Sequence, residues 1–221
     1  MPRLRLYASN DRPELHRQKR ISMTNEEHSE DQSNDQRARW DIKYEQGLPS
    51  LTEPDPFFIS ACERFVTSSL PKPGAALDLA GGLGRHALWL ASRSWQVSVV
   101  DASDVAIGKL SQAALGLNVK LELLVGDAAE FRFEPAHFDL IVLFDHLDRS
   151  LFPRIVSALK PGGLLICKMS LRWDSGKSST TSNTNPLHRN ELPSLVPELD
   201  VLHHQERPVR DRGVVEFAGR K

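Results

Sequence analysis

The sequence has few cysteines, almost no net charge and no long apolar run, and each absence argues against a class of protein. Its two cysteines, Cys62 and Cys167, lie far apart in the chain, which disfavours a disulfide framework or a cysteine metal site. The formal net charge is -1, so the whole molecule has no electrostatic attraction to nucleic acid or to an anionic membrane. No apolar run is long enough to span a bilayer. We therefore expect a cytoplasmic protein without nucleic-acid or membrane partners.

The opening segment of the chain, residues 1–39, lacks the hydrophobic periodicity of the rest. It is rich in Arg, Glu, Asp, Ser, Asn and Gln, a composition typical of disorder. It contains no apolar segment of the kind that directs secretion, and Met23 is a second candidate start. We expect residues 1–39 to be a disordered tail and residues 40–221 to form one domain.

Strand-like and helix-like segments alternate from Ala75 onward. Repeated strand–helix–strand units of this kind imply a parallel, doubly wound sheet. Two later strand-like runs have no helix between them and predict an antiparallel pair at one edge of the sheet. The expected fold is therefore α/β and Rossmann-like, with a mostly parallel seven-stranded sheet. The seven predicted strands are residues 75–80, 96–101, 119–125, 138–144, 164–169, 200–205 and 214–219.

A glycine-rich turn follows the first predicted strand. The segment from Asp78 to Ala87 reads DLAGGLGRHA, and glycines at a strand-to-helix turn let the backbone bend sharply and approach a ligand closely. The helix that follows presents free N–H groups. Seventeen residues after Gly84 the next strand ends in Asp101, where a carboxylate can accept both hydroxyls of an adenosine ribose. This spacing predicts a site for an adenosine-containing cofactor.

The glycine turn alone is compatible with two cofactors. Gly82, Gly84 and Ala87 fit the dinucleotide fingerprint G-x-G-x-x-[GA], so a dinucleotide-dependent oxidoreductase is one alternative. A non-catalytic adenosine-binding module is another. Asp78, inside the first strand, favours a cationic ligand because its negative charge would repel a pyrophosphate. Asp127, after the third strand, can accept a hydrogen bond from an adenine amino group.

Together these motifs resemble those of the class I S-adenosylmethionine-dependent methyltransferases, from about Trp40 to the end of the chain. The segment from Asp78 resembles the family's D-x-G-x-G-x-G motif, with Ala80 in place of its first glycine. Residues 126–128 match the adenine-contacting turn, and residues 159–163 match the turn before the fifth strand. Within the superfamily the chain is most similar to small-molecule methyltransferases of the tellurite-resistance and thiopurine type.

The resemblance implies that the chain transfers a methyl group from S-adenosylmethionine to a small-molecule acceptor by in-line displacement. In such a reaction the protein mainly aligns the nucleophile and excludes water, and no metal is expected. The implied cofactor-binding residues lie on the glycine turn and on the strand ends around it. They are Asp78, Ala80, Gly81, Gly82, Gly84, Asp101, Ala102, Asp127, Ala128 and Phe144.

The turn after the fourth predicted strand, which begins at Phe144, should lie beside the transferred methyl group. In this turn His146 is the candidate general base, because the pKa of histidine suits neutral pH; the alternative is a polar turn residue without a catalytic role. The Asn/Asp-Pro-Pro-Tyr tetrapeptide, which resembles what enzymes that methylate amino groups of nucleic acids and proteins carry here, is absent.

Two further segments have open interpretations. Trp40 and Tyr44 lie four residues apart on one predicted helix face and either cover the cofactor or pack as part of an ordinary amphipathic helix. The polar run 172–186 is either a lid over the substrate or an insertion.

Overall fold

The structure is a computed structural model of the 221-residue chain. It describes residues 5–6, 37–46, 52–70, 72–173, 186–209 and 212–221. Most of the predicted tail and most of the polar run 172–186 therefore lie outside the described residues.

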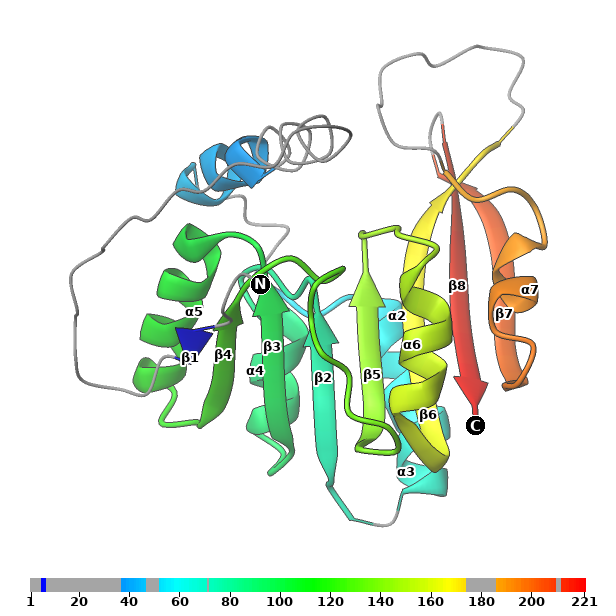
Figure 1. The fold of residues 1–221 in the computed structure, drawn as a ribbon, viewed down its shortest axis with the longest axis horizontal. Helices are drawn as coiled ribbons and strands as arrows, with labels where there is room; N and C mark the ends of the chain where they lie inside the picture. The colour runs from blue at the N-terminus through cyan, green and yellow to red at the C-terminus, as the bar shows by residue number, and fades with distance from the viewer. Residues whose placement is uncertain (1–4, 7–36, 47–51, 71, 174–185, 210–211) are drawn as a thin grey trace, which may run out of the picture.

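One sheet runs through the centre of the molecule, with the strand order β1-β4-β3-β2-β5-β6-β8-β7 (Figure 1). Five neighbouring strands are parallel, as the alternation of strands and helices predicts. They are β2 (Ala75–Leu79), β3 (Gln96–Asp101), β4 (Leu121–Val125), β5 (Phe138–Phe144) and β6 (Leu159–Leu171).

At one edge of the sheet, β8 (Arg212–Arg220) pairs antiparallel with β6, and β7 (Asp200–Val209) pairs antiparallel with β8. The predicted seven-stranded, mostly parallel sheet with an antiparallel C-terminal pair is thus confirmed. At the opposite edge, the two-residue strand β1 (Arg5–Leu6) pairs antiparallel with β4. The sequence did not predict β1, because two residues are too few to show any periodicity.

One local expectation is wrong: the run 159–163, predicted to be a turn, forms the first part of β6. Gly162 has a φ of 80°, and the pairing of β5 with β6 shifts register between Phe138 and Leu140. This segment is hydrogen-bonded to the end of the chain: the Gly162 N–H donates to the Lys221 carbonyl at 2.7 Å. In the strand pairing Leu159 is followed directly by Leu164, so residues 160–163 form an irregular start of β6.

Helices cover both faces of the sheet. On one face lie α2 (Pro56–Ala61), α4 (Arg85–Ala91) and α5 (Asp104–Gly116). On the other lie α6 (Leu151–Ala158) and α7 (Glu191–Leu195). Because neighbouring residues of a strand point to opposite faces, a central strand buried between the two layers has to be apolar throughout, as β5 is.

The helix α2 begins where its sequence specifies a start. Asp55 accepts a hydrogen bond from the Phe57 N–H at 2.8 Å, and Pro56 occupies the first helical position, where no N–H is needed. The helix continues through the π-helical turn η2 (Cys62–Val66) into α3 (Thr67–Ser69). None of the described helices is both long enough and apolar enough to cross a membrane.

Candidate functional site

The glycine turn connects the carboxyl end of β2 to α4. Gly82 and Gly84 have φ values of 56° and 70°, in the left-handed region that favours glycine. A β-carbon on Gly84 would lie 2.3 Å from Leu110, and one on Gly82 would lie 2.6 Å from the Tyr44 hydroxyl. Both glycines are therefore required by the backbone conformation and by the space around them.

Ala80 occupies the position of the motif's first glycine and has a left-handed backbone conformation. Its φ is 54°, a left-handed conformation that costs an L-residue about 1–2 kcal/mol. The turn after it closes normally, with the Gly84 N–H donating to the Gly81 carbonyl at 2.9 Å. The turn therefore closes with alanine at this position, at the cost of local strain.

Asp101, the last residue of β3, is bonded to the glycine turn. Its Oδ2 accepts the Gly82 N–H at 2.7 Å, and its Oδ1 accepts the Ser103 N–H at 2.9 Å. Burial raises the pKa of Asp101, and these two N–H donors act in the opposite direction. Each carboxylate oxygen has more than one lone pair, so the group retains acceptor capacity for the two hydroxyls of a ribose.

Asp78 is a second carboxylate beneath the same turn. It is 1% exposed, and its Oδ2 accepts the Ala87 N–H of α4 at 3.1 Å. Burial raises the pKa of Asp78 to about 7, with the negative charge of Asp101 adding to the effect and the Ala87 N–H and Arg85 opposing it. A cationic ligand at this position would favour ionisation of both carboxyl groups.

The other predicted cofactor residues lie at the neighbouring strand ends. In the turn after β4, Asp127 Oδ1 accepts the Ala129 N–H at 2.9 Å, and Ala128 packs into the core beneath it. Ala102 follows Asp101 and is half-buried. The Phe144 ring, at the end of β5, lies 4.4 Å from the His86 ring. The carboxyl ends of β2, β3, β4 and β5 are adjacent, so all ten predicted residues lie at this end of the strands.

A helix over residues 37–45 brings two aromatic side chains to the glycine turn. Tyr44 is 7% exposed, with its hydroxyl against Gly82, and the Trp40 ring stacks on it at 5.6 Å. Burial and the charge of Asp101 raise the pKa of Tyr44, so its hydroxyl stays protonated at neutral pH.

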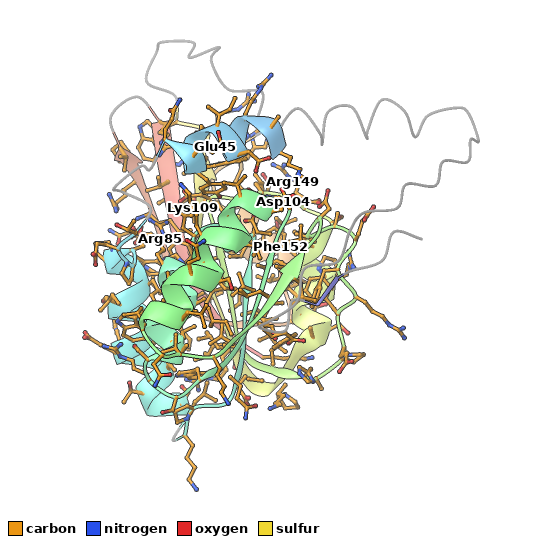
Figure 2. All side chains as sticks on the ribbon, turned by 90° about the vertical axis from the view of Figure 1, so that its left-hand side faces the viewer. Glu45, Arg85, Asp104, Lys109, Arg149 and Phe152 are labelled. Carbon is orange, nitrogen blue, oxygen red and sulfur yellow. The ribbon has the colours of Figure 1, made fainter. Side chains whose placement is uncertain are left out.

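Polar contacts with α5 hold this 37–45 helix in place (Figure 2). Lys109 Nζ donates to the Tyr44 carbonyl at 2.6 Å, and Arg37 pairs with Asp104 at 2.8 Å. The Ser103 hydroxyl, which caps α5, also donates to Asp41. These contacts join segments more than 60 residues apart in the chain.

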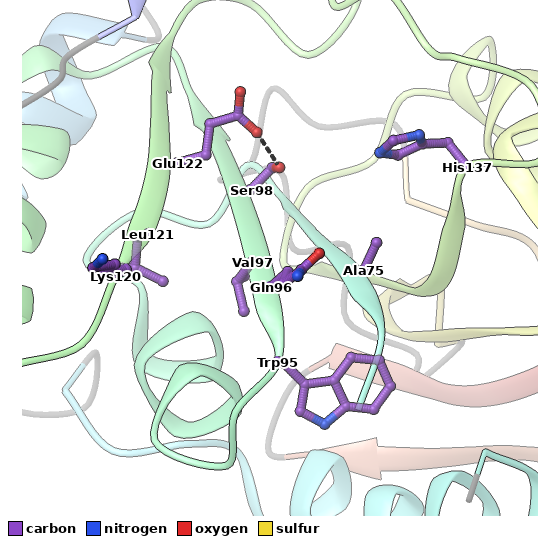
Figure 3. Close-up of a pocket in the computed structure, with 9 residues that line it drawn as sticks. All are labelled: Ala75, Trp95, Gln96, Val97, Ser98, Lys120, Leu121, Glu122 and His137. Atoms are coloured by element: carbon purple, nitrogen blue, oxygen red, sulfur yellow. Dashed lines mark hydrogen bonds between the residues drawn. The ribbon is translucent and has the colours of Figure 1, made fainter. Parts of the chain in front are cut away.

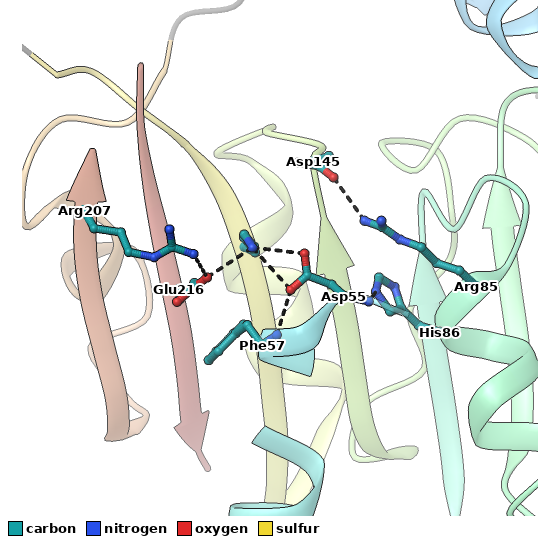
Figure 4. A network of polar contacts seen from close by, with 8 residues as sticks. Asp55, Phe57, Arg85, His86, Asp145, Arg207 and Glu216 are labelled. Atoms are coloured by element: carbon teal, nitrogen blue, oxygen red, sulfur yellow. Dashed lines mark hydrogen bonds and ion pairs between the residues drawn. The ribbon is translucent and has the colours of Figure 1, made fainter. Parts of the chain in front are cut away.

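The turn after β5 faces the glycine turn from the other side. Asp145 has a φ of 58° and accepts from Arg85, the first residue of α4, at 3.2 Å (Figure 4). The next residue, His146, has a buried Nε2 atom without a hydrogen-bond partner among the described residues. A positive charge on His146 would lower the pKa of Asp101, which indicates that the two side chains lie within electrostatic reach of each other.

Four charged side chains form a network beside this turn, from α2 across β6 and β8 to β7 (Figure 4). Lys168 Nζ pairs with Asp55 at 3.0 Å and with Glu216 at 3.1 Å, and Arg207 pairs with Glu216 at 2.7 Å. Although burial alone would raise it, the pKa of Glu216 is lowered overall by the hydrogen bonds from Arg207 and Lys168. The two positive and two negative groups of this four-charge network compensate one another.

His86 connects the four-charge network to the glycine turn. Its Nε2 accepts the Asp55 N–H at 3.3 Å, and burial lowers its pKa to about 3. His86 is therefore neutral at physiological pH and acts as a hydrogen-bond acceptor between α4 and α2.

A pocket of about 390 Å³ lies at the opposite ends of the strands from the glycine turn, between the amino ends of β2, β3 and β4 (Figure 3). Its polar lining includes Ser98, which donates to Glu122 at 2.5 Å. Open α/β sheets bind ligands at the carboxyl ends of their strands, so this pocket has no relation to the glycine turn. Within the described ranges, no group of three or more His, Cys, Asp or Glu side chains is arranged to hold a metal ion.

Arg85 has no predicted role, although the structure places it between the glycine turn and the turn after β5. A sequence signal for it does exist. A cation in the first turn of a helix lies at the positive end of the helix dipole, where it is disfavoured unless an anion is near. The pair Gly84-Arg85 at the start of a helix therefore predicts an anionic partner.

The fold and the site define the class of protein: a Rossmann-like domain with a glycine turn after β2 and an acid at the end of β3. Comparison with known families identifies it further. A family model described as a methyltransferase domain matches residues 76–163, so this segment of the chain is similar to methyltransferase domains. The dinucleotide oxidoreductase alternative is not supported by this match. A search of the curated proteins finds no match.

Solved structures of low sequence identity share the fold. TehB from Haemophilus influenzae has a TM-score of 0.64 at 18% identity, with 76% of this chain and 62% of that chain covered. The N-methyltransferase NodS from Bradyrhizobium japonicum WM9, in complex with S-adenosylhomocysteine, has a TM-score of 0.63 at 18% identity, with 84% and 97% covered. The [4+2]-cyclase SpnF has a TM-score of 0.65 at 16% identity, with 74% and 79% covered.

Proposed function

We propose that this protein binds S-adenosylmethionine at the glycine turn and transfers its methyl group to a small-molecule acceptor. The observation that carries the proposal is the pair of buried carboxylates, Asp78 and Asp101, on either side of the turn. A ligand that carries a sulfonium and an ammonium would compensate their charge, whereas a pyrophosphate would add to it. The family match supports the same cofactor.

Each predicted residue has a role in this proposal. Asp101 accepts the ribose hydroxyls, Asp127 accepts the adenine amino group, and Asp78 faces the cationic end of the ligand. Tyr44 and Trp40 cover the ligand from the 37–45 helix. The remaining residues form the walls and the close backbone approach of the site: Ala80, Gly81, Gly82, Gly84, Ala102, Ala128 and Phe144.

The bound cofactor supplies a methyl carbon already activated by its sulfonium, so the protein has to orient the acceptor and exclude water. We assign His146 as the general base that takes the acceptor's proton. Its buried Nε2 atom, which has no partner in the described part of the chain, is available to accept that proton. The position of His146, two residues after the end of β5 and within electrostatic reach of Asp101, supports this role.

The proposal extends to the compartment of the protein and to the bounds of its domain. The buried free thiols of Cys62 and Cys167 suit a reducing compartment, so we propose a cytoplasmic enzyme. We also propose that residues 40–221 form the methyltransferase domain. The N-methyltransferase NodS supports methyl transfer on this fold, but the cyclase SpnF has the same fold, so methyl transfer has to be measured directly.

Equilibrium binding of S-adenosylmethionine, S-adenosylhomocysteine and NADH to the purified protein tests the cofactor. We expect both sulfur ligands to bind and NADH not to bind. Tight binding of NADH with no response to the sulfur ligands would contradict the proposal.

Methyl release onto thiol, selenium, tellurium and phenol acceptors tests the reaction and the base together. His146→Gln should lower kcat on a phenol by about 100-fold, the usual contribution of a general base. Its effect on a thiol should be smaller, because thiols ionise closer to neutral pH than phenols do. His137→Gln is the matched control, because His137 is exposed and lies just before the amino end of β5, at the opposite end of that strand from His146. Equal losses on both acceptors would contradict the assignment of His146, and no turnover on any acceptor would favour a non-catalytic binding module.

A further inference from the structure

We propose that Arg85 is the binding site for the α-carboxylate of the cofactor, and that Asp145 holds this guanidinium until the ligand's carboxylate replaces it. The inference rests on the proposed binding of S-adenosylmethionine. It adds the residue that recognises the amino-acid end of the ligand, for which the motif residues supply no cation.

The Arg85–Asp145 ion pair spans the point where the strand order of the sheet reverses. β2 has β3 on one side and β5 on the other, and ligands of open α/β sheets bind in the crevice at such a point. Arg85 comes directly after the glycine turn that follows β2, and Asp145 comes directly after β5. Their contact at 3.2 Å crosses from one wall of this crevice to the other.

Arg85 is central among the ionisable groups of the site. Its positive charge lowers the pKa of Asp78, of Tyr44 and of His86. The amino-acid end of the cofactor carries a carboxylate and an ammonium, so it requires a cation and an anion close together. Arg85 and Asp78 provide this combination beside the glycine turn.

The two partners of the ion pair differ in a way that allows exchange. The Arg85 side chain is only 13% exposed, whereas that of Asp145 is 50% exposed. A half-exposed carboxylate gains little from the pair and regains its hydration when it leaves. A ligand carboxylate can bind a guanidinium through two parallel hydrogen bonds, which is the stronger geometry.

Asp145 is also held in an unfavourable conformation. Its φ of 58° is left-handed, and its N–H donates to the Lys168 carbonyl at 2.9 Å. Strained residues of this kind concentrate at ligand sites, where the surrounding structure imposes their conformation. The backbone of β6 thus fixes the Asp145 carboxylate opposite Arg85.

The test compares the dissociation constants of S-adenosylmethionine and of its decarboxylated analogue, which lacks only the α-carboxylate. The wild-type protein should prefer S-adenosylmethionine by about tenfold or more, as expected for a charged hydrogen-bonded pair. Arg85→Gln should abolish this preference by weakening the binding of S-adenosylmethionine alone. Arg93→Gln, just beyond the other end of α4, should retain it and serves as the matched control.

Asp145→Asn tests the exchange separately and does not depend on how Arg85→Gln folds. Without the competing carboxylate, S-adenosylmethionine should bind about threefold more tightly, and the analogue should change less. Equal weakening of both ligands by Arg85→Gln, or a preference that survives it, would overturn the carboxylate site. Unchanged binding of S-adenosylmethionine to Asp145→Asn would overturn the exchange. Failure of the wild-type protein to bind either ligand would instead contradict the proposed function.

Discussion

The carboxylates on the two sides of the site are held in different ways. On the cofactor side, Asp78 and Asp101 accept hydrogen bonds from backbone N–H groups. On the side of β6 and β8, Asp55 and Glu216 are paired with the side chains of Lys168 and Arg207. Backbone N–H groups orient a carboxylate without neutralising it, whereas the side-chain cations neutralise theirs.

This difference separates ligand binding from stability. Under the proposed function, a cationic ligand would stabilise the ionised forms of Asp78 and Asp101. The four-charge network is complete by itself and fixes the N-terminus of α2 against the sheet. Substitutions on the first side should therefore change cofactor affinity, and substitutions on the second should change the free energy of unfolding.

The largest effect is expected at Asp101. Asp101→Ala should weaken S-adenosylmethionine binding by at least tenfold, since a charged hydrogen bond contributes about 1.5–3 kcal/mol. Asp200→Ala, at an exposed position at the start of β7, is the control and should leave the affinity unchanged. Isothermal titration of both variants checks this, and unchanged affinity in Asp101→Ala would mean that the ribose binds elsewhere.

The matching substitution on the other side is Lys168→Met, which leaves Asp55 and Glu216 facing each other without their shared cation. We expect a loss of about 1–3 kcal/mol in the free energy of unfolding, less than for a fully buried pair because these side chains are partly exposed. Lys160→Met removes the more exposed pair with Asp139 and should cost at most about 1 kcal/mol. Urea unfolding measures both losses. A similar loss in the two variants would remove the distinction between the network and an ordinary surface pair.

The raised pKa of Asp78, about 7, predicts a pH dependence on the cofactor side. Only the ionised carboxylate attracts the cationic ligand, so S-adenosylmethionine affinity should fall below that pKa, by at most about tenfold per pH unit, and level off above it. Without the cofactor the sign is reversed. The folded-state pKa lies above the ordinary value of 3.8, so Asp78 favours folding at low pH and this contribution is lost as the pH rises towards about 7. Asp78→Asn should flatten both profiles, and persistence of either would show that another group titrates.

The smallest effect is expected at Ala80. Ala80→Gly should stabilise the protein by about 0.5–1 kcal/mol, because relief of the left-handed strain outweighs the entropy that glycine gains in the unfolded chain. Ala136, whose φ is 49°, lies outside the site and offers the matched substitution. Thermal unfolding should show similar gains in both variants, and neither should change S-adenosylmethionine affinity by more than about twofold. Weaker binding in Ala80→Gly alone would show that the alanine shapes the site.

The sequence predicted the geometry around the glycine turn because the signals for it are local. The strand-to-helix glycine turn, Asp78 before it and Asp101 after it are set by spacing along about 25 residues of chain. The run 159–163 was misassigned because its partner is the last residue of the chain, Lys221. The binding roles of the ten predicted residues, and the base role of His146, stay predictions.

The sequence by itself determined which strands are parallel, where the glycine turn lies and which acids flank it, since periodicity and short spacings act within one strand–helix–strand unit. Only the tertiary structure decided the side-chain partners across the crevice. Asp55 and Lys168 are 113 residues apart, and Arg85 and Asp145 are 60 residues apart. Such pairs depend on strand register and on the packing of α2 and α4 against the sheet. The motif therefore predicts the cofactor class, whereas the side chains that we propose to meet the ligand's amino-acid end and the acceptor are brought together by the fold.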